Sequence, residues 1–167
     1  RGLWAEPHYS RPQRITTGGA TRFGSVSSGL GESTAEGLVA VHDRVRHHIS
    51  RTLIRRTFEV AEETGAALPA CPVTDSLRLL GEDDDSEAVD RARYRAVQTP
   101  QTFDLERLHR AYEQPFSPQF TDDASVYAAA GLGAITLVEG EETNIKLPTP
   151  RDLLMADLLL DYPRPRR

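Results

Sequence analysis

Lysine is nearly absent from this sequence, since 19 of the 20 basic residues are arginine and only Lys146 carries an ammonium group. Cysteine is equally scarce: Cys71 has no second thiol with which to form an internal disulfide, and its place in the apolar stretch 66–73 predicts a small packed residue rather than a nucleophile. No run of about 18 apolar residues is present that could span a membrane. We therefore expect a cytoplasmic protein of a reducing compartment with no membrane segment.

The charge and the size of the chain narrow the class of protein further. A net charge of -5 is mild and does not suggest the basic surface that nucleic-acid-binding domains usually display, so we expect no nucleic-acid partner. With 38% apolar and 27% charged residues, the 167-residue chain has the composition of one globular domain. A chain of this size hides about 70% of its unfolded surface. The sequence begins at Arg1 rather than at Met, and we expect a further segment upstream of it.

The central part of the sequence predicts a strand, a helix and a second strand. Residues 38–42 form a short apolar run that ends at Asp43, as buried parallel strands do. From Ser50, a suitable N-cap, apolar residues recur at helical spacing up to Gly65, which suits the position just after a helix. Residues 66–73 have the pattern of the second strand. This order is a crossover unit, which implies parallel pairing of the two strands and the α/β fold class.

Further elements flank this crossover unit within what we interpret as a single domain, 1–167. A glycine-rich turn at 17–22 leads into a helix near 25–30, and residues 74–94 predict a projecting arm with an acidic tip. The remaining predictions are helices over 103–112 and 122–130, a strand over 135–138, a final helix that begins with Thr149-Pro150, and a disordered tail at 163–167.

Charged and hydroxyl-bearing residues gather at the predicted strand ends and loops, where open α/β sheets bind ligands. They are the acid Asp43, the cations Arg46, Arg91 and Lys146, and the hydroxyl residues Ser76, Thr99 and Thr121. Such groups suit phosphate and polyol ligands, and Asp43 could hold a divalent cation or accept hydrogen bonds from hydroxyl groups. Taken singly, each residue has at least as good an interpretation as a solvated surface charge or a structural group.

Two other clusters have structural interpretations. Asp122 and Asp123 precede a predicted helix, where carboxylates cap free N–H groups, and a ligand role stays equally open. His42, His47 and His48 lie close together in the sequence, but no cysteine or glutamate pair accompanies them at zinc spacing. We therefore expect no metal site built from these histidines.

Nine short stretches, in order along residues 18–160, match the pattern of one enzyme family. They are Gly18-Gly19-Ala20-Thr21-Arg22 with Ser25-Val26 and Gly29-Leu30, Val41-His42-Asp43 with Val45-Arg46, Pro72-Val73-Thr74-Asp75-Ser76-Leu77, Val89-Asp90-Arg91, Gln98-Thr99-Pro100-Gln101, Phe120-Thr121-Asp122-Asp123-Ala124-Ser125, Val138-Glu139-Gly140, Asn144-Ile145-Lys146, and Thr149-Pro150-Arg151-Asp152-Leu153. Each stretch alone is a weak signal, whereas nine in order are specific. On these stretches the sequence resembles the methylerythritol phosphate cytidylyltransferases of the non-mevalonate isoprenoid pathway.

The resemblance implies a fold and a reaction. The fold is a Rossmann-like mixed, mostly parallel sheet of the nucleotide-diphospho-sugar transferase type, with a β-arm at about 72–94 that joins two subunits into a homodimer. The reaction uses Mg²⁺: a phosphate oxygen of methylerythritol phosphate attacks the α-phosphorus of CTP, and pyrophosphate leaves. Because two anionic phosphates repel each other, positioned cations must neutralise them and fix an in-line approach.

The resemblance assigns the phosphate end of the site to four residues. Arg91 and Lys146 would hold and aim the attacking phosphate, while Thr99 and Thr121 would line the same site. Arginine binds phosphate in bidentate fashion, whereas lysine acts as a compact point charge. This difference would explain why position 146 carries lysine in a sequence whose other basic residues are all arginine. Because Arg91 lies in the arm, it would serve the active site of the other subunit, and an isolated monomer would be inactive.

The resemblance also assigns the alcohol and nucleotide ends of the site. Asp43, Arg46 and Ser76 would contact the methylerythritol hydroxyl groups, with Ser76 standing where many relatives have threonine. Gly19 and Ser25 would accommodate the cytidine, since the glycine leaves room and the hydroxyl group reads the nucleotide.

The sequence departs from the family pattern in three places. The glycine-rich loop that cradles the triphosphate would lie upstream of Arg1, so we expect residues 1–167 alone not to turn over CTP. Arg44 stands where relatives have a small residue, and His47 replaces a usual proline. Two alternatives stay open: a ribitol phosphate cytidylyltransferase, which the stretch 121–125 disfavours, and a non-catalytic dimerising remnant.

Overall fold

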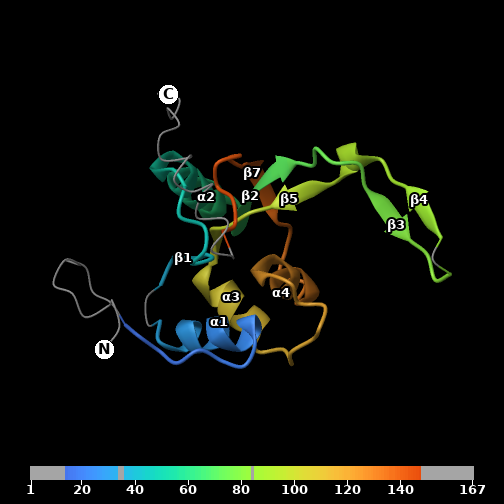
Figure 1. Ribbon diagram of the computed structural model, residues 1–167. Helices are drawn as coiled ribbons and strands as arrows, with labels where there is room; N and C mark the ends of the chain where they lie inside the picture. The colour runs from blue at the N-terminus through green and yellow to red at the C-terminus, as the bar shows by residue number, and fades with distance from the viewer. Residues whose placement is uncertain (1–13, 34–35, 84, 148–167) are drawn as a thin grey trace. The chain divides into compact units, whose positions relative to one another are not determined.

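The chain divides into two compact units, one formed by Arg1–Ala35 and the other by Glu36–Arg167. The computed structural model, drawn in Figure 1, describes residues 14–33, 36–83 and 85–147. The helix predicted to begin at Thr149 and the tail predicted at 163–167 lie outside the described residues.

The first unit contains one described helix, α1 (Arg22–Gly31), where the sequence predicts a helix near 25–30. The helix begins after Thr21, whose side chain accepts a hydrogen bond from the backbone N–H of Gly24 at 3.0 Å. Such a cap satisfies one of the N–H groups that a helix start leaves without a partner.

The second unit is built on a mixed five-stranded sheet. Its strands are β1 (Leu38–Val41), β2 (Ala66–Pro72), β5 (Arg95–Val97), β6 (Gln101–Asp104) and β7 (Thr136–Glu139). Strand β6 pairs antiparallel with both β1 and β2, and β5 continues along β2 beyond β6, also antiparallel. Strand β7 pairs parallel with β2. The α/β fold class with a mixed sheet is confirmed.

The predicted direct parallel pairing of the two crossover strands is wrong. Strand β6 lies between β1 and β2 and runs antiparallel to each, so β1 and β2 point the same way without being neighbours. Strand β6 was missing from the sequence prediction because it is only four residues long and contains one apolar residue, Phe103. Successive side chains of a strand point to opposite faces, so Thr102 lies on one face of the sheet and Phe103 on the other.

Helix α2 (Arg51–Thr64) covers the Thr102 face of this sheet, and its predicted ends are confirmed. The Ser50 hydroxyl accepts from the backbone N–H of Leu53 at 3.0 Å, and Gly65 ends the helix in the left-handed region with φ 86°. Inside the interface the hydroxyl group of Thr102 donates to that of Thr57 at 3.1 Å. The apolar residues buried around them are Leu53, Ala61, Ala67 and Val138.

Helices α3 (Leu105–Tyr112) and α4 (Asp123–Ala129) pack with the Phe103 side of the sheet. The rings of Phe103 and Tyr127 lie with their centroids 5.2 Å apart, and both residues are fully buried. Helix α3 begins at Leu105 rather than at the predicted Phe103, because Asp104 is the N-cap and accepts from the backbone N–H of Arg107 at 2.9 Å. Leu105, Leu108 and Tyr112 are buried on the face of α3 that packs inward.

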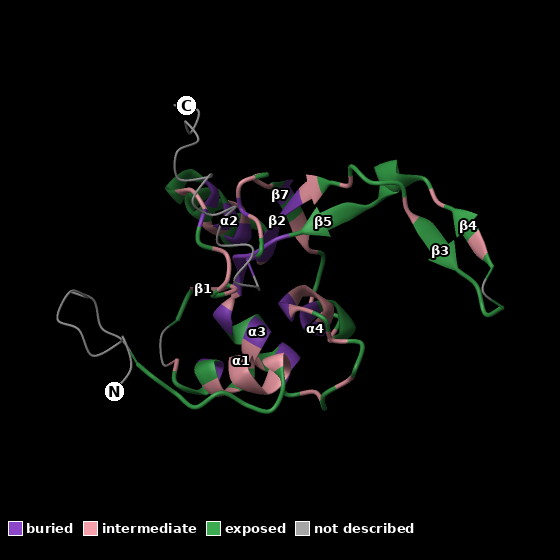
Figure 2. Cartoon of the chain, viewed as in Figure 1, coloured by how far each residue is buried: buried purple, intermediate pink, exposed green. Residues whose placement is uncertain are grey.

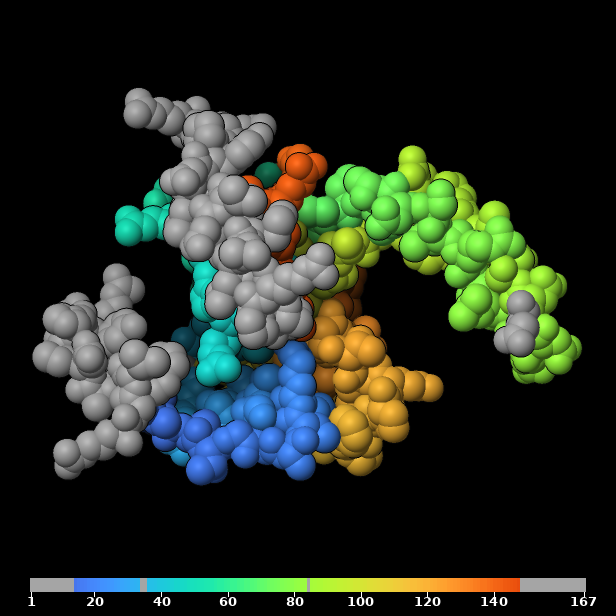
Figure 3. All heavy atoms as spheres, in the orientation of Figure 1, coloured from blue at the N-terminus to red at the C-terminus, as the bar shows by residue number. Residues whose placement is uncertain are grey.

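A hairpin occupies the segment where the sequence predicts a projecting arm. Strands β3 (Arg78–Leu80) and β4 (Ser86–Ala88) pair antiparallel, and a 3₁₀ turn, η2 (Arg91–Arg93), leads back to the sheet. Figure 2 shows this hairpin almost wholly as exposed surface, and in Figure 3 its atoms extend away from the body of the unit. Leu80 at its end is 79% exposed.

Candidate active site

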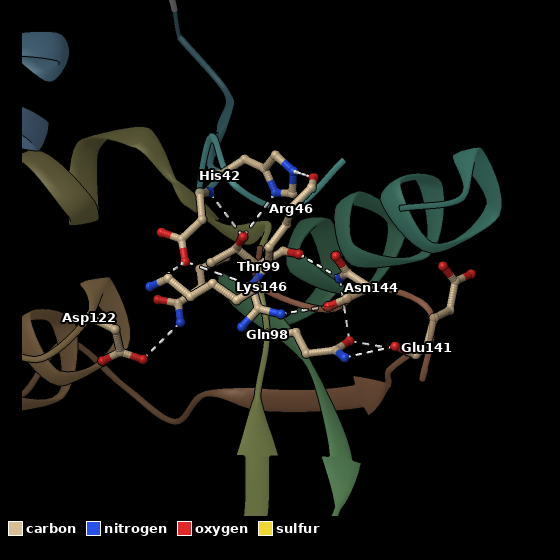
Figure 4. A network of polar contacts seen from close by, with 10 residues as sticks. His42, Arg46, Gln98, Thr99, Asp122, Glu141, Asn144 and Lys146 are labelled. Atoms are coloured by element: carbon tan, nitrogen blue, oxygen red, sulfur yellow. Dashed lines mark hydrogen bonds and ion pairs between the residues drawn. The ribbon is translucent and has the colours of Figure 1, made fainter. Parts of the chain in front are cut away.

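An ion cluster forms where β1 ends and where the loop after β7 returns to it (Figure 4). A carboxylate oxygen of Asp43 lies 3.2 Å from the ammonium nitrogen of Lys146 and 3.7 Å from Nε of Arg46. The three residues differ in accessibility: the side chains of Asp43 and Arg46 are 17% and 12% exposed, whereas that of Lys146 is 54% exposed. Lys146 is therefore the cation of this cluster that an incoming anion meets first.

Arg46 joins the two loops that carry the cluster. Its guanidinium donates to the backbone carbonyl of Asn144 at 2.5 Å, and its backbone N–H donates to the carbonyl of Asp43 at 3.0 Å. One residue further along, the backbone N–H of Leu147 donates to the carbonyl of Val45 at 2.9 Å. The backbone on both sides of Lys146 is thus bonded to the Asp43 loop, at Asn144 by the Arg46 side chain and at Leu147 by the Val45 carbonyl.

The side-chain amide of Gln98 anchors the start of the Lys146 loop. Its NH₂ group donates to the carbonyl of Glu141 at 2.8 Å, and its oxygen accepts from the backbone N–H of Glu141 at 3.1 Å. The Glu141 carboxylate in turn accepts from the backbone N–H of Ser50 at 3.0 Å and from its hydroxyl group. The Gln98 side-chain amide therefore bonds both backbone groups of Glu141, as a neighbouring strand residue would.

Asn144 fixes the middle of the same loop. The residue is fully buried, and its NH₂ group donates to the carbonyl of Thr99 at 2.9 Å. The oxygen of its amide and Nε of Arg46 are the two buried side-chain polar atoms of the described residues that have no hydrogen-bond partner. Buried polar atoms without a partner are uncommon, and both of these lie in this cluster.

Thr99 and His42 tie the Asp43 loop to the sheet. The Thr99 oxygen accepts from the backbone N–H of Asp43 at 3.0 Å and lies 2.9 Å from Nδ1 of His42. The other ring nitrogen of His42 lies 2.8 Å from the carbonyl of Arg46. Thr99 itself is only 5% exposed. The structure thus places Thr99 beneath the ion cluster, where it supports Asp43.

Gly140, directly after β7, lies where the chain passes very close to Gln98 and Cys71. A Cβ atom at this position would lie 2.6 Å from Oε1 of Gln98 and 2.8 Å from the sulfur of Cys71. Both distances are shorter than side chains tolerate, so a larger residue would push the loop away from Gln98. The glycine therefore lets the chain pass close enough for the Gln98 contacts to form.

The sequence-predicted site residues fall into four groups. Asp43, Arg46, Thr99 and Lys146 are brought together as described. Thr121 is exposed and directly precedes Asp122, the N-cap of α4. The side-chain amide of Gln101, in β6, donates to the Asp122 carboxylate at 2.8 Å. This bond brings the start of α4 to the strand that follows Thr99.

Ser76 and Arg91 lie at the base of the arm and join no hydrogen bond or ion pair of the cluster that the structure describes. Ser76 is exposed. The Arg91 guanidinium donates to the carbonyl of Thr74, within the arm itself. The two residues are therefore held by their own segment alone.

Gly19 and Ser25 belong to the first unit, where they contact each other. The Ser25 hydroxyl group accepts from the backbone N–H of Gly19 and donates to the carbonyl of Thr21, both at 3.0 Å. A Cβ atom on Gly19 would lie 2.7 Å from the backbone of Gly24. The glycine is thus needed locally, where the turn folds back against the start of its own helix.

Asp122 and Asp123, for which cap and ligand roles were both open, have clear structural partners. Asp122 accepts from the backbone N–H of Ser125 at 2.8 Å and forms a capping box with it. Asp123 is fully buried and accepts from the hydroxyl group of Tyr112 at 2.6 Å. Both carboxylates therefore hold α4 in place.

Cys71 has the surroundings of an unreactive thiol. Burial, and then the carboxylates of Glu142 and Glu139, raise its pKa above the usual value of 9.0. The thiol stays protonated near neutral pH, and a thiol is a far weaker nucleophile than a thiolate. This result agrees with the prediction that Cys71 packs rather than reacts.

Four residues of the cluster were not predicted as site residues from the sequence: His42, Gln98, Glu141 and Asn144. Three of them lie in the stretches that carry the family resemblance, but none has a charge or position that predicts a ligand. Their contacts are to backbone groups or to other side chains of the cluster. Such roles depend on which loops meet, which spacing in the sequence does not reveal.

Two negative findings concern the described residues. Among them no three or more His, Cys, Asp or Glu side chains lie together in a way that could hold a metal ion. No helix in the same part of the chain is sufficiently long and apolar to cross a membrane.

The comparison with protein families identifies the family of this chain. A family model described as 2-C-methyl-D-erythritol 4-phosphate cytidylyltransferase matches residues 6–162 of this chain. The chain belongs to this family. The resemblance seen in the nine stretches is thereby confirmed, as is the family's cytidylyltransferase class of enzyme.

Individual relatives agree with this assignment. The 2-C-methyl-D-erythritol 4-phosphate cytidylyltransferase of Bacteroides thetaiotaomicron is 47% identical over 158 residues, which cover 95% of this chain and 71% of the relative. That of Porphyromonas gingivalis is 48% identical over 152 residues, 91% of this chain and 68% of the relative.

Solved structures of the family have the same fold. The crystal structure of 2-C-methyl-D-erythritol 4-phosphate cytidylyltransferase from Thermus thermophilus matches with a TM-score of 0.76 and 35% identity, over 94% of this chain and 79% of that one. The 4-diphosphocytidyl-2C-methyl-D-erythritol synthase from Anaerococcus prevotii matches with a TM-score of 0.85 and 27% identity, over 93% and 73%.

Proposed function

We propose that this chain transfers the cytidylyl group of CTP to methylerythritol phosphate, as a step of non-mevalonate isoprenoid synthesis. An oxygen of the alcohol's phosphate forms a bond to the α-phosphorus of CTP, the bond from that phosphorus to the bridging oxygen breaks, and pyrophosphate leaves with the electron pair. The products are CDP-methylerythritol and pyrophosphate. The observation that carries the proposal is the Asp43, Arg46 and Lys146 cluster in a chain of this family.

Lys146 is the residue that receives the attacking phosphate. Its ammonium group is half exposed and paired with a single carboxylate oxygen of Asp43 at 3.2 Å. A phosphate dianion carries more charge than a carboxylate and replaces Asp43 as the partner of the ammonium group. Lys146 then neutralises the nucleophile, which lowers its repulsion from the triphosphate and holds it in line with the α-phosphorus.

Asp43 and Arg46 recognise the alcohol part of the substrate. Once Lys146 turns to the phosphate, the Asp43 carboxylate can accept hydrogen bonds from hydroxyl groups. The Arg46 guanidinium, whose Nε lies 3.7 Å from that carboxylate, holds Asp43 beside these hydroxyl groups. Thr121, which is exposed, and Thr99, which supports Asp43 from beneath, complete this side of the site.

Arg91 and Ser76 serve the active site of a second copy of this chain. Both lie at the base of the arm and join no bond of the described ion cluster. A homodimer in which the arm of one subunit reaches the site of the other would bring a second cation to the phosphate and a hydroxyl group to the alcohol. The exposed Leu79 and Leu80 of the arm would be covered by the same contact.

The family resemblance assigns Gly19 and Ser25 to the nucleotide. Both belong to the first unit, where Gly19 carries no side chain and the Ser25 hydroxyl group, in α1, accepts its backbone N–H. Since the described residues hold no cluster for a metal ion, the Mg²⁺ that accompanies CTP would take its ligands mainly from phosphate oxygens and water.

Pyrophosphate release by the full-length protein tests the proposal. Separate reactions contain CTP and Mg²⁺ with methylerythritol phosphate, with ribitol phosphate, or with neither alcohol. We expect release with methylerythritol phosphate. Release with ribitol phosphate alone would assign the chain to the rival substrate, and no release with either alcohol would leave a dimerising remnant as the better interpretation.

A further inference from the structure

The imidazole ring of His42 has a defined proton arrangement that follows from its two partners. Nε2 lies 2.8 Å from the backbone carbonyl of Arg46, and a carbonyl oxygen can only accept. In the neutral ring Nε2 must therefore carry the proton. Nδ1 is then unprotonated and can only accept a hydrogen bond, and the atom that faces it is the Thr99 hydroxyl oxygen at 2.9 Å.

The arrangement of His42 determines what the Thr99 hydroxyl group can do. Its proton is donated to Nδ1 of His42, and one of its lone pairs accepts the backbone N–H of Asp43 at 3.0 Å. With its donor occupied and the residue 5% exposed, Thr99 has no proton to give to a substrate phosphate. Thr99 is instead oriented so that its oxygen faces the backbone of Asp43.

The bonds of His42 and Thr99 hold the backbone of both Asp43 and Arg46. Asp43 and Arg46 lie in one turn, closed by the bond from the Arg46 N–H to the Asp43 carbonyl at 3.0 Å. His42 holds this turn at two points: directly at the Arg46 carbonyl, and through Thr99 at the Asp43 N–H. These bonds fix the backbone from which the Asp43 carboxylate reaches Lys146.

We propose that His42 is a positioning residue of this enzyme: as the Nε2–H tautomer it orients the Thr99 hydroxyl group, and Thr99 then holds Asp43 where it meets the alcohol. The inference rests on the proposed function, in which Asp43 contacts the substrate hydroxyl groups. His42 itself touches no substrate. Its effect is on the affinity for the alcohol phosphate, while the affinity for CTP is set elsewhere.

Two substitutions of His42 distinguish the contribution of Nδ1 from that of Nε2. In His42→Asn the amide oxygen is bonded to Cγ, as Nδ1 is, so an acceptor for Thr99 is kept while the reach to Arg46 is lost. His42→Gln extends an NH₂ group toward the Arg46 carbonyl but offers no acceptor at the Nδ1 position. We expect KM for methylerythritol phosphate to rise about tenfold in His42→Gln, as loss of one hydrogen bond of about 1.4 kcal/mol would give, and clearly less in His42→Asn.

Controls distinguish positioning from general damage. KM for CTP should stay within about twofold in both variants, and His47→Gln, an exposed histidine five residues on, should behave as wild type. Thr99→Val should resemble His42→Gln, and the double variant should add little, because the two residues act through one chain of bonds. Equal rises in both KM values, or full additivity, would contradict the proposal.

An independent measurement examines the tautomer without catalysis. Nitrogen NMR of ¹⁵N-histidine-labelled protein at mildly alkaline pH should show His42, assigned by its loss in His42→Gln, with a protonated Nε2 and an unprotonated Nδ1. A protonated Nδ1 would overturn the inference even in an active enzyme. If neither alcohol is turned over the proposed function fails, and the NMR result still decides whether His42 orients Thr99.

Discussion

The loops around Asp43 and Lys146 and the arm around Arg91 are built in opposite ways. In the loops, side chains of Gln98, Thr99 and Asn144 bind backbone groups of segments that lie more than 40 residues away in the sequence. The arm has a short ladder of three residue pairs and exposed side chains on both strands. The loops are therefore held by bonds between distant segments, whereas the described residues of the arm are held by bonds within the arm.

This difference shows how an active site can be divided between a fixed and a dependent part. Fixed groups keep their geometry because many bonds determine it, and such preorganisation is what catalysis of charged reactions requires. Under the proposed function, the arm would contribute only when a second subunit holds it. Substitutions in the two regions should accordingly fail in different ways.

Loss of Lys146 should have the largest effect. Lys146→Ala removes the cation proposed to receive the attacking phosphate, and we expect kcat/KM to fall about 10²- to 10³-fold, as for removal of a group aimed at developing charge. Stability should hardly change because the side chain is 54% exposed. Arg55→Ala, an exposed cation on α2, is the matched control and should retain wild-type pyrophosphate release. Activity in Lys146→Ala near the wild-type level would place the phosphate elsewhere.

Arg91 tests whether the arm serves the neighbouring subunit. Arg91→Ala should lower kcat/KM about 10- to 100-fold, the range for a hydrogen bond to a charged group. Mixing unfolded Arg91→Ala and Lys146→Ala subunits and refolding them together should restore about one quarter of wild-type activity, because half of the dimers are mixed and each of these has one intact site. No recovery on mixing would show that Arg91 acts in its own subunit, or not at all.

Gly140→Ala should damage the fixed loops through packing. The new methyl group would meet Gln98 and Cys71 at 2.6 and 2.8 Å, so we expect the free energy of unfolding to fall by about 1–3 kcal/mol. Denaturant unfolding measures the change. Gly29→Ala in α1, where a Cβ meets nothing within 4 Å, should be neutral or slightly stabilising. Equal free energies of unfolding for the two variants would mean that the loop at Gly140 can shift to accept a methyl group without loss of stability.

Leu80→Ser should have the smallest effect on the folded subunit. The side chain is 79% exposed, so the stability of a single subunit should change by less than about 0.5 kcal/mol. Sedimentation should nevertheless show weaker self-association, since the arm is proposed to be covered in the dimer. Ile54→Ser, at a 37% exposed position on α2, should leave association unchanged. An unaltered dimer in Leu80→Ser would remove the apolar arm tip from the proposed contact.

The sequence predicted the elements whose signals are local. Helix α2 was found with its Ser50 cap and Gly65 end because capping residues and apolar spacing lie within that segment. The predicted hairpin region was recognisable from its acidic turn and short flanks. By contrast β5 and β6 were missed, because three- and four-residue strands carry too few residues to show a period.

The site was predictable only in part, for a related reason. Asp43, Arg46 and Lys146 were selected because their charge and their place in family stretches indicated ligands. Thr99 was selected as well, but its support of Asp43 depends on contacts 56 and 57 residues apart in the sequence. Gln98 and Asn144 show the same limit, since a neutral amide gives no sign of which backbone it will bind.

Under the proposed function, the Asp43–Lys146 pair would also select the substrate before any chemistry begins. A neutral polyol would bring no charge with which to replace the carboxylate, so the ammonium group would keep its partner and the Asp43 carboxylate would stay occupied. A phosphorylated alcohol would supply the replacement anion itself and so free the carboxylate for its own hydroxyl groups. Inhibitors directed at this ion cluster should accordingly carry an anionic group at the Lys146 end, and uncharged sugar mimics should be poor starting points.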